Sequence, residues 1–118
     1  MQVDFLKRII ESSLDDDKAE DIVTIDLAGK SSFADYMIVA SGRSQRHVFT
    51  LADKLSSRLK DAGNAPLSIE GQENCDWVVV DCGDIIVHLF KPEIREMYNL
   101  EKMWATPVIT AETATAKR

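Results

Sequence analysis

The feature that most constrains the fold is the stretch 76–90, DWVVVDCGDIIVHLF, in which two apolar runs meet at Gly83-Asp84. Gly-Asp between two apolar runs is typical of a two-residue β-hairpin, and glycine in the first central position suits a type II′ turn. Side chains alternate between the two faces of a strand. This turn therefore predicts one apolar face, formed by the cross-strand pairs Cys82 with Ile85, Val80 with Val87 and Val78 with Leu89.

The opposite face of the predicted hairpin collects every unusual residue of the stretch: Trp77, Val79, Asp81, Ile86, His88 and Phe90. Helices on both faces of the sheet would leave Asp81 and His88 hydrogen-bonded within a mixed core. Helices on the apolar face alone would leave an aromatic and polar surface, and a patch of that kind usually marks an interface. Tryptophan contributes strongly to such interfaces, which makes Trp77 the leading candidate for a partner contact.

The rest of the chain alternates between helical and strand patterns. Apolar residues at three- and four-residue steps predict helices, one of them with Ser44 as its N-cap and Gly63 as its stop. Asn99 is a position at which the last helix could divide in two. In chain order we expect helix 3–14, strand 21–27, strand 35–42, helix 45–62, strand 67–71, the two hairpin strands and helix 92–104.

This order predicts an α/β protein with a single mixed sheet of about five strands and helices packed on it. The length of 118 residues suits one domain. We expect that domain to span residues 1–104, with residues 105–118 as a flexible tail, because the tail alternates small and polar residues without a sustained period.

The charge balance favours a basic protein partner over a nucleic acid. Twenty acidic against fourteen basic residues give a net charge of −6, which repels phosphate backbones. This repulsion leads us to expect no direct DNA binding. No apolar run has the length of a signal or membrane segment, so we expect a cytoplasmic protein with no membrane contact.

The sequence predicts neither a metal site nor a disulfide. Cys75 and Cys82 lack metal-type spacing, and if both lay on one strand their side chains would point to opposite faces about 23 Å apart. His47 and His88 have no Cys or His cluster around them. We therefore expect two reduced thiols and no cofactor.

One alternative from a different class is a nucleotide-binding or nucleotidyltransferase enzyme. The turn Ser41-Gly42 before a helix, with Arg43 and Arg46 nearby, could hold a phosphate, although such turns commonly use Ser and Gly for capping and backbone freedom. Nucleotidyl transfer also needs grouped carboxylates. Asp26, Asp35 and Asp81 could converge only through a particular strand arrangement, and no acid is placed to orient His47 for nucleophilic catalysis.

Three ordered blocks resemble the ribosomal silencing factor family, also called RsfS or Iojap. They are ADYMIVASGRSQRHV (34–48), EGQENCDWVVVDCGDIIVHLF (70–90) and REMYNLEKMW (95–104). The resemblance implies a nucleotidyltransferase-like fold without that activity, so that the chain is not an enzyme, and it implies a homodimer. It also implies binding to large-subunit ribosomal protein fourteen, steric blocking of subunit joining, repression of translation initiation under nutrient limitation, and a role in large-subunit maturation.

Carried onto this sequence, the resemblance and the predicted facing together suggest a partner-binding surface. Its aromatic part would comprise Trp77, His88 and Phe90 on the hairpin, with Tyr98 beside them. Its acidic part, facing Lys and Arg of the partner, would comprise Glu70, Glu73, Asp81 and Glu101. Some of these residues could instead form the contact between the two copies of a dimer.

Overall fold

The computed structural model describes residues 3–27, 29, 32 and 34–99 of the chain, so the expected tail at 105–118 lies outside the described residues. The predicted order of helices and strands is confirmed. The elements are α1 (Val3–Asp16), β1 (Glu20–Asp26), β2 (Tyr36–Ser41), α2 (Gln45–Asp61), β3 (Ser68–Glu70), β4 (Trp77–Asp81), β5 (Ile85–Phe90) and α3 (Pro92–Tyr98).

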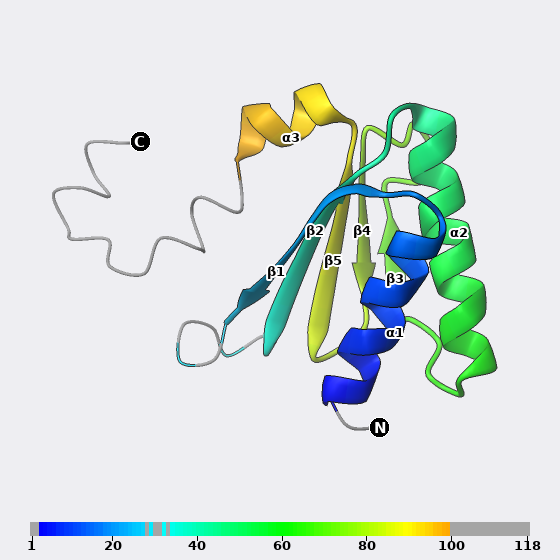
Figure 1. The fold of residues 1–118 in the computed structure, drawn as a ribbon, viewed down its shortest axis with the longest axis vertical. Helices are drawn as coiled ribbons and strands as arrows, with labels where there is room; N and C mark the ends of the chain where they lie inside the picture. The colour runs from blue at the N-terminus through cyan, green and yellow to red at the C-terminus, as the bar shows by residue number, and fades with distance from the viewer. Residues whose placement is uncertain (1–2, 28, 30–31, 33, 100–118) are drawn as a thin grey trace, which may run out of the picture.

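The five strands form one mixed sheet in the order β1-β2-β5-β4-β3 (Figure 1). The central strands β2 and β5 are parallel, whereas every other neighbouring pair is antiparallel. It follows that β3 runs in the same direction as β2, and α2 connects these two strands. The structure thus confirms the predicted α/β class with a five-stranded mixed sheet.

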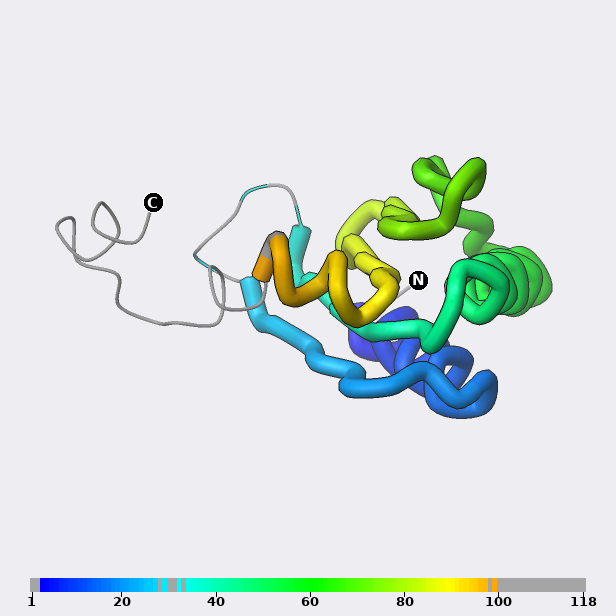
Figure 2. Tube along the Cα trace, turned by 90° about the horizontal axis from the view of Figure 1, so that it is seen from above, coloured from blue at the N-terminus to red at the C-terminus, as the bar shows by residue number. Residues whose placement is uncertain are grey.

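Helices α1 and α2 pack side by side on one face of the sheet, which we call the first face. The view from above shows α3 apart from them (Figure 2), and it lies at the end of the sheet where β5 stops (Figure 1). The main core lies between α1, α2 and the first face, and it includes Ile10, Leu55 and Val87, each with 0% of its surface exposed. Burial of such aliphatic side chains is the main source of stability in a domain of this size.

Helix α2 has the limits that its sequence predicts. The Ser44 hydroxyl accepts a hydrogen bond from the backbone N–H of His47 at 3.1 Å, as an N-cap does. At the other end, Gly63 has a φ of 78° and its N–H donates to the carbonyl of Lys60. The sequence predicts a single apolar stripe along this helix that ends at Ala62, which is half-buried. The rest of the stripe is fully buried against the sheet and α1: Val48, Leu51, Ala52, Leu55 and Leu59.

One local expectation needs correction, and the condition that the sequence set on the two cysteines is not met. Helix α1 continues to Asp16, two residues beyond the predicted limit, and ends where Lys18 turns left-handed with a φ of 68°. Cys75 and Cys82 do not share a strand, because Cys75 precedes β4 and has a φ of 58°. This turn breaks the alternation, and both thiols join the core of the first face as free, buried cysteines.

Candidate partner interface

The β4–β5 hairpin sorts its side chains as the sequence predicts. Val78 and Val80 lie on the first face and are fully buried in its core. Gly83 has a φ of 87°, the positive value that the first central position of a type II′ turn requires. The opposite side of the sheet, which we call the second face, carries the cross-strand pairs Trp77 with Phe90, Val79 with His88 and Asp81 with Ile86.

The second face extends across the sheet in rows. One row runs from Val39 through His88 and Val79 to Glu70, because each residue is the cross-strand partner of the next. Glu70 is exposed at the edge of the sheet, whereas Val39 is fully buried. An acidic edge therefore borders the aromatic part of this face.

The expectation that His88 and Phe90 would be open to a partner is wrong for the described chain. Phe90 has 0% of its surface exposed and His88 has 9%. Trp77 and Ile86 remain partly exposed. Neither of the two arrangements that the sequence left open holds completely, since His88 and Phe90 on β5 are covered while Trp77, Val79 and Asp81 on β4 and Ile86 on β5 stay partly accessible.

Helix α3 contributes to this cover. Ile94 packs against the cluster of the second face that contains Phe90. The Arg95 guanidinium, 8% exposed, donates a hydrogen bond to the Ser41 hydroxyl at 2.8 Å. Asn99 ends the helix in a left-handed conformation with φ 51° and ψ 46°, so the helix stops at the position where the sequence allowed a break.

Trp77 is held by two aromatic neighbours on β5. Its ring stacks on that of Phe90 with centroids 5.0 Å apart and planes tilted by 26°. Its indole N–H donates to Nδ1 of His88 at 3.0 Å. The partly exposed indole therefore rests on a buried ring and is tied by its polar atom to a buried imidazole.

Burial lowers the pKa of His88 to about 4. The imidazole is therefore neutral at pH 7. Because Nδ1 accepts the indole hydrogen bond, the ring proton is assigned to Nε2. His88 is an acceptor in this site, not a positive charge.

The predicted acidic residues have different environments. Glu70 and Glu73 are exposed. Asp81 is partly buried, and its Oδ1 accepts the backbone N–H of Gly83 at 2.9 Å, so this carboxylate caps the hairpin turn. The side chain of Tyr98 and the whole of Glu101 lie outside the described part of the structure.

Sequence reasoning missed Arg95 and Asp76. In the sequence, Arg95 looks like any charged residue on the surface of a helix. No neighbouring residue indicates that its side chain reaches Ser41, 54 residues away. Asp76, next to Trp77, accepts from the Gln45 amide at 3.2 Å and forms an ion pair with Lys91 at 3.4 Å. Asp76 thus joins the start of β4 to α2 and to the segment that leads into α3, whereas Arg95 joins α3 to β2.

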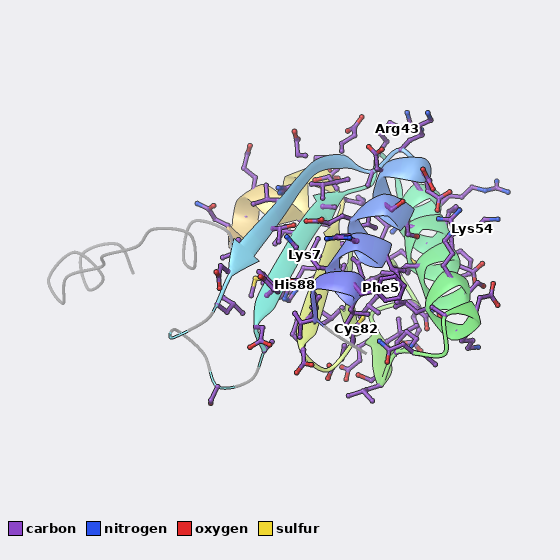
Figure 3. All side chains as sticks on the ribbon, turned by 60° about the horizontal axis from the view of Figure 1, so that its bottom comes forward. Phe5, Lys7, Arg43, Lys54, Cys82 and His88 are labelled. Atoms are coloured by element: carbon purple, nitrogen blue, oxygen red, sulfur yellow. The ribbon has the colours of Figure 1, made fainter. Side chains whose placement is uncertain are left out.

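The turn Ser41-Gly42 is built for packing. The Ser41 hydroxyl is bound by Arg95, and a Cβ added to Gly42 would lie 2.8 Å from Cγ2 of Val48. His47 is an acceptor at Nδ1 for the Arg43 N–H and lies 2.9 Å from the Asp17 carbonyl through Nε2. In Figure 3, Arg43 points away from the molecule at the start of α2.

The three aspartates that the enzyme alternative needs do not converge. Two strands, β2 and β5, separate Asp26 on β1 from Asp81 on β4. Asp35 precedes β2 and pairs through its backbone with Leu27 and Asp84. Within the residues that the structure describes, no group of three His, Cys, Asp or Glu could hold a metal ion, and no helix is long and apolar enough to span a membrane.

Comparison with known proteins gives concordant results. The family model described as "Ribosomal silencing factor during starvation" matches residues 2–118. The chain is 55% identical over 101 residues to the ribosomal silencing factor RsfS of Zymomonas mobilis, covering 86% of this chain and 76% of the relative. It is 35% identical over 99 residues to the mouse "mitochondrial assembly of ribosomal large subunit protein 1", covering 81% of this chain and 43% of that protein.

The fold is also found in a solved structure. A crystal structure of a Chromobacterium violaceum protein superposes with a TM-score of 0.87 at 34% sequence identity, covering 93% of this chain and 92% of that one. Because the family model matches nearly the whole chain and the first-named relative is more than half identical, the chain belongs to the ribosomal silencing factor family.

Proposed function

We propose that this protein is a ribosomal silencing factor that binds the large ribosomal subunit through large-subunit ribosomal protein fourteen. The bound protein blocks the approach of the small subunit sterically, and so represses translation initiation when nutrients are limiting. Family membership supports the silencing role. The mouse relative, whose name refers to large-subunit assembly, supports the choice of subunit and a further role in large-subunit maturation.

The observation that carries this proposal is the partly exposed indole of Trp77 on the second face. Large aromatic side chains set in an apolar surround are the usual anchors of protein interfaces. Here the ring is supported from below by Phe90, and the partly exposed Val79 is the next residue of β4 on the same face. Such a site suits a protein partner with an apolar contact at its centre.

The charge of the surrounding surface suits a basic partner. Glu70 is exposed at the edge of the second face, Glu73 is exposed in the turn between β3 and β4, and the whole chain carries a charge of −6. Complementary charge increases the rate of association and disfavours wrong partners. A basic ribosomal protein meets this requirement, whereas bare RNA would be repelled.

The mechanism that we propose is occlusion without catalysis or a cofactor. The protein acts in the cytoplasm as a homodimer, and the part of the second face that does not meet the ribosome contributes to the contact between copies. The contacts at Ser41-Gly42 and the separation of Asp26 from Asp81 support a binding role over an enzymatic one.

The test is co-sedimentation of purified protein with large ribosomal subunits. We expect Trp77→Ala to reduce binding at least about 30-fold, as the loss of a central aromatic anchor does. The matched control is Phe49→Ala, which removes an aromatic ring that is 45% exposed on α2, on the other side of the sheet. Circular dichroism and thermal melting verify that both variants fold.

Binding of Trp77→Ala at the level of the unaltered protein would exclude the second face as the docking surface. Equal losses in both variants would indicate a general defect and would also count against the proposal. The subunit-joining assay, in which added protein lowers the yield of complete ribosomes, tests the occlusion mechanism separately.

A further inference from the structure

The hydrogen bond between Trp77 and His88 runs diagonally across two strands. The cross-strand partner of Trp77 is Phe90, whereas His88 is the partner of Val79. The indole therefore leans along the sheet to reach Nδ1 of His88, with ring centroids 5.8 Å apart. Diagonal neighbours are within reach of long aromatic side chains on the same face.

The described contacts of the indole with Phe90 and His88 restrict different motions. Stacking on Phe90 keeps the ring plane near the sheet, yet it permits the ring to slide and to turn within that plane. A hydrogen bond is directional, and it weakens steeply away from a straight donor–acceptor line. The bond to His88 consequently selects one orientation of the indole from those that the stack allows.

His88 itself is poorly placed to touch a partner. Its surface is 9% exposed, and its centroid lies 6.1 Å from that of the fully buried Phe90. Its lowered pKa keeps Nδ1 available as an acceptor throughout the neutral range. The imidazole is thus a buried, neutral group. Its described hydrogen bond is made with Trp77, the residue that we place at the centre of the interface.

We infer that His88 is a positioning residue: by accepting the indole N–H, it holds Trp77 in the orientation that meets the ribosomal partner. This inference rests on the proposed function for its binding consequence, although the orientation of the indole is a property of the free protein. The sequence placed His88 among the residues that contact the partner because it lies on the second face. Under the present inference, His88 acts through Trp77 and does not contact the partner.

The energetic reason is preorganisation. If the indole samples several orientations, only the fraction in the binding orientation is competent, and the apparent Kd rises as that fraction falls. The loss of a neutral hydrogen bond changes such a population about three- to tenfold. We therefore expect loss of the acceptor to weaken large-subunit binding by about three- to tenfold, without removing the aromatic anchor.

The test compares His88→Asn with His88→Leu. The two replacements have similar size and shape, but only the Asn carbonyl oxygen can stand near the position of Nδ1 and accept the indole N–H. We expect His88→Asn to bind large subunits within about twofold of the unaltered protein, and His88→Leu to bind three- to tenfold more weakly. Thermal melting verifies that both variants fold.

The orientation of the indole is read directly in the free protein by NMR. The indole N–H resonance is assigned with Trp77→Phe, and its heteronuclear NOE reports motion of the ring. We expect a rigid indole in the unaltered protein and in His88→Asn, and a mobile one in His88→Leu. A merely structural role of His88 would not make the acceptor variant differ from the apolar one in this measurement.

A double substitution isolates the hydrogen bond. Trp77→Phe keeps an aromatic ring on Phe90 but has no N–H, so adding His88→Leu to it should weaken binding no further. A rigid indole in His88→Leu, or an equal loss with Leu and Asn, would overturn the inference. If the unaltered protein failed to bind large subunits, the proposed function would fall, while the NMR comparison would still decide whether His88 orients Trp77.

Discussion

The guanidinium of Arg95 on α3 donates a hydrogen bond to the hydroxyl of Ser41 at the end of β2, at 2.8 Å. Both residues are buried, with 8% and 2% of their surfaces exposed. The bond joins the last described helix to a central strand of the sheet. It helps to hold α3 where it covers the end of the second face, and so it links the stability of α3 to the shape of the candidate interface.

We expect Ser41→Ala to lower the free energy of unfolding by about 1.5–3 kcal/mol, because it removes a buried acceptor from a charged donor. The measurement is urea denaturation. Ser57→Ala is the matched control, since Ser57 is exposed on α2 and its replacement should change stability by at most about 0.5 kcal/mol. Faster hydrogen exchange at the Arg95 and Asn99 amides in Ser41→Ala would locate the loss in α3, and equal stability of the two variants would contradict the role of this bond.

The turn before β4 predicts a strong glycine effect. Gly71 has a φ of 90°, and a Cβ at this position would lie 2.1 Å from the carbonyl oxygen of Trp77. Gly71→Ala should therefore destabilise the fold by more than about 2 kcal/mol and displace the start of β4. Gly63→Ala is the control, because Gly63 has a similar φ of 78° with nothing within 4 Å and should cost only about 1 kcal/mol. Comparable melting temperatures for the two variants would argue against this close approach.

His88 predicts a specific pH dependence of stability. Its folded pKa of about 4 lies below the ordinary value of 6.5, so the unfolded chain takes up a proton before the native protein does. Stability should therefore fall as pH decreases from about 6.5 to about 4, by up to about 3 kcal/mol in total. Denaturant unfolding at several pH values measures this slope. The difference between the unaltered protein and His88→Asn isolates the His88 contribution from that of the carboxylates, and identical slopes would refute the assignment.

The acidic edge predicts a salt-dependent change in ribosome binding. Glu70→Lys reverses an exposed charge beside the aromatic part of the second face and should weaken large-subunit binding roughly tenfold at low salt, with a smaller effect at high salt. Asp53→Lys makes the same change of charge on the exposed side of α2 and serves as the control. An equal loss with both variants would show that net charge, rather than this edge, governs association.

The local sequence was sufficient to predict the helices and strands and to predict which side chains of the hairpin lie on each face of the sheet. A two-residue turn at Gly83-Asp84 sets the register, and strand alternation then assigns Trp77 to the second face without any knowledge of the fold. The N-cap at Ser44 and the stop at Gly63 depend likewise on neighbouring residues. Where a residue with positive φ interrupted the pattern, as at Cys75, the alternation rule failed.

The solvent exposure of the side chains on the second face could not be predicted from the local sequence. Alternation tells which side a residue points to, but the cover over Phe90 and His88 depends on where remote elements pack. The sequence showed Arg95 as one more charged residue on a short helix. Its partner Ser41 is 54 positions away, and only the packing of α3 against the end of β2 brings them together.

The sequence by itself therefore determined the strands, the turn and the residues that share each face, because these follow from backbone geometry over a few residues. The tertiary structure alone decided that Trp77 stays partly exposed while His88 and Phe90 are buried beneath and beside it. The physical reason is that burial is a property of the whole packing arrangement, in which contacts between distant segments determine the surface that each side chain retains.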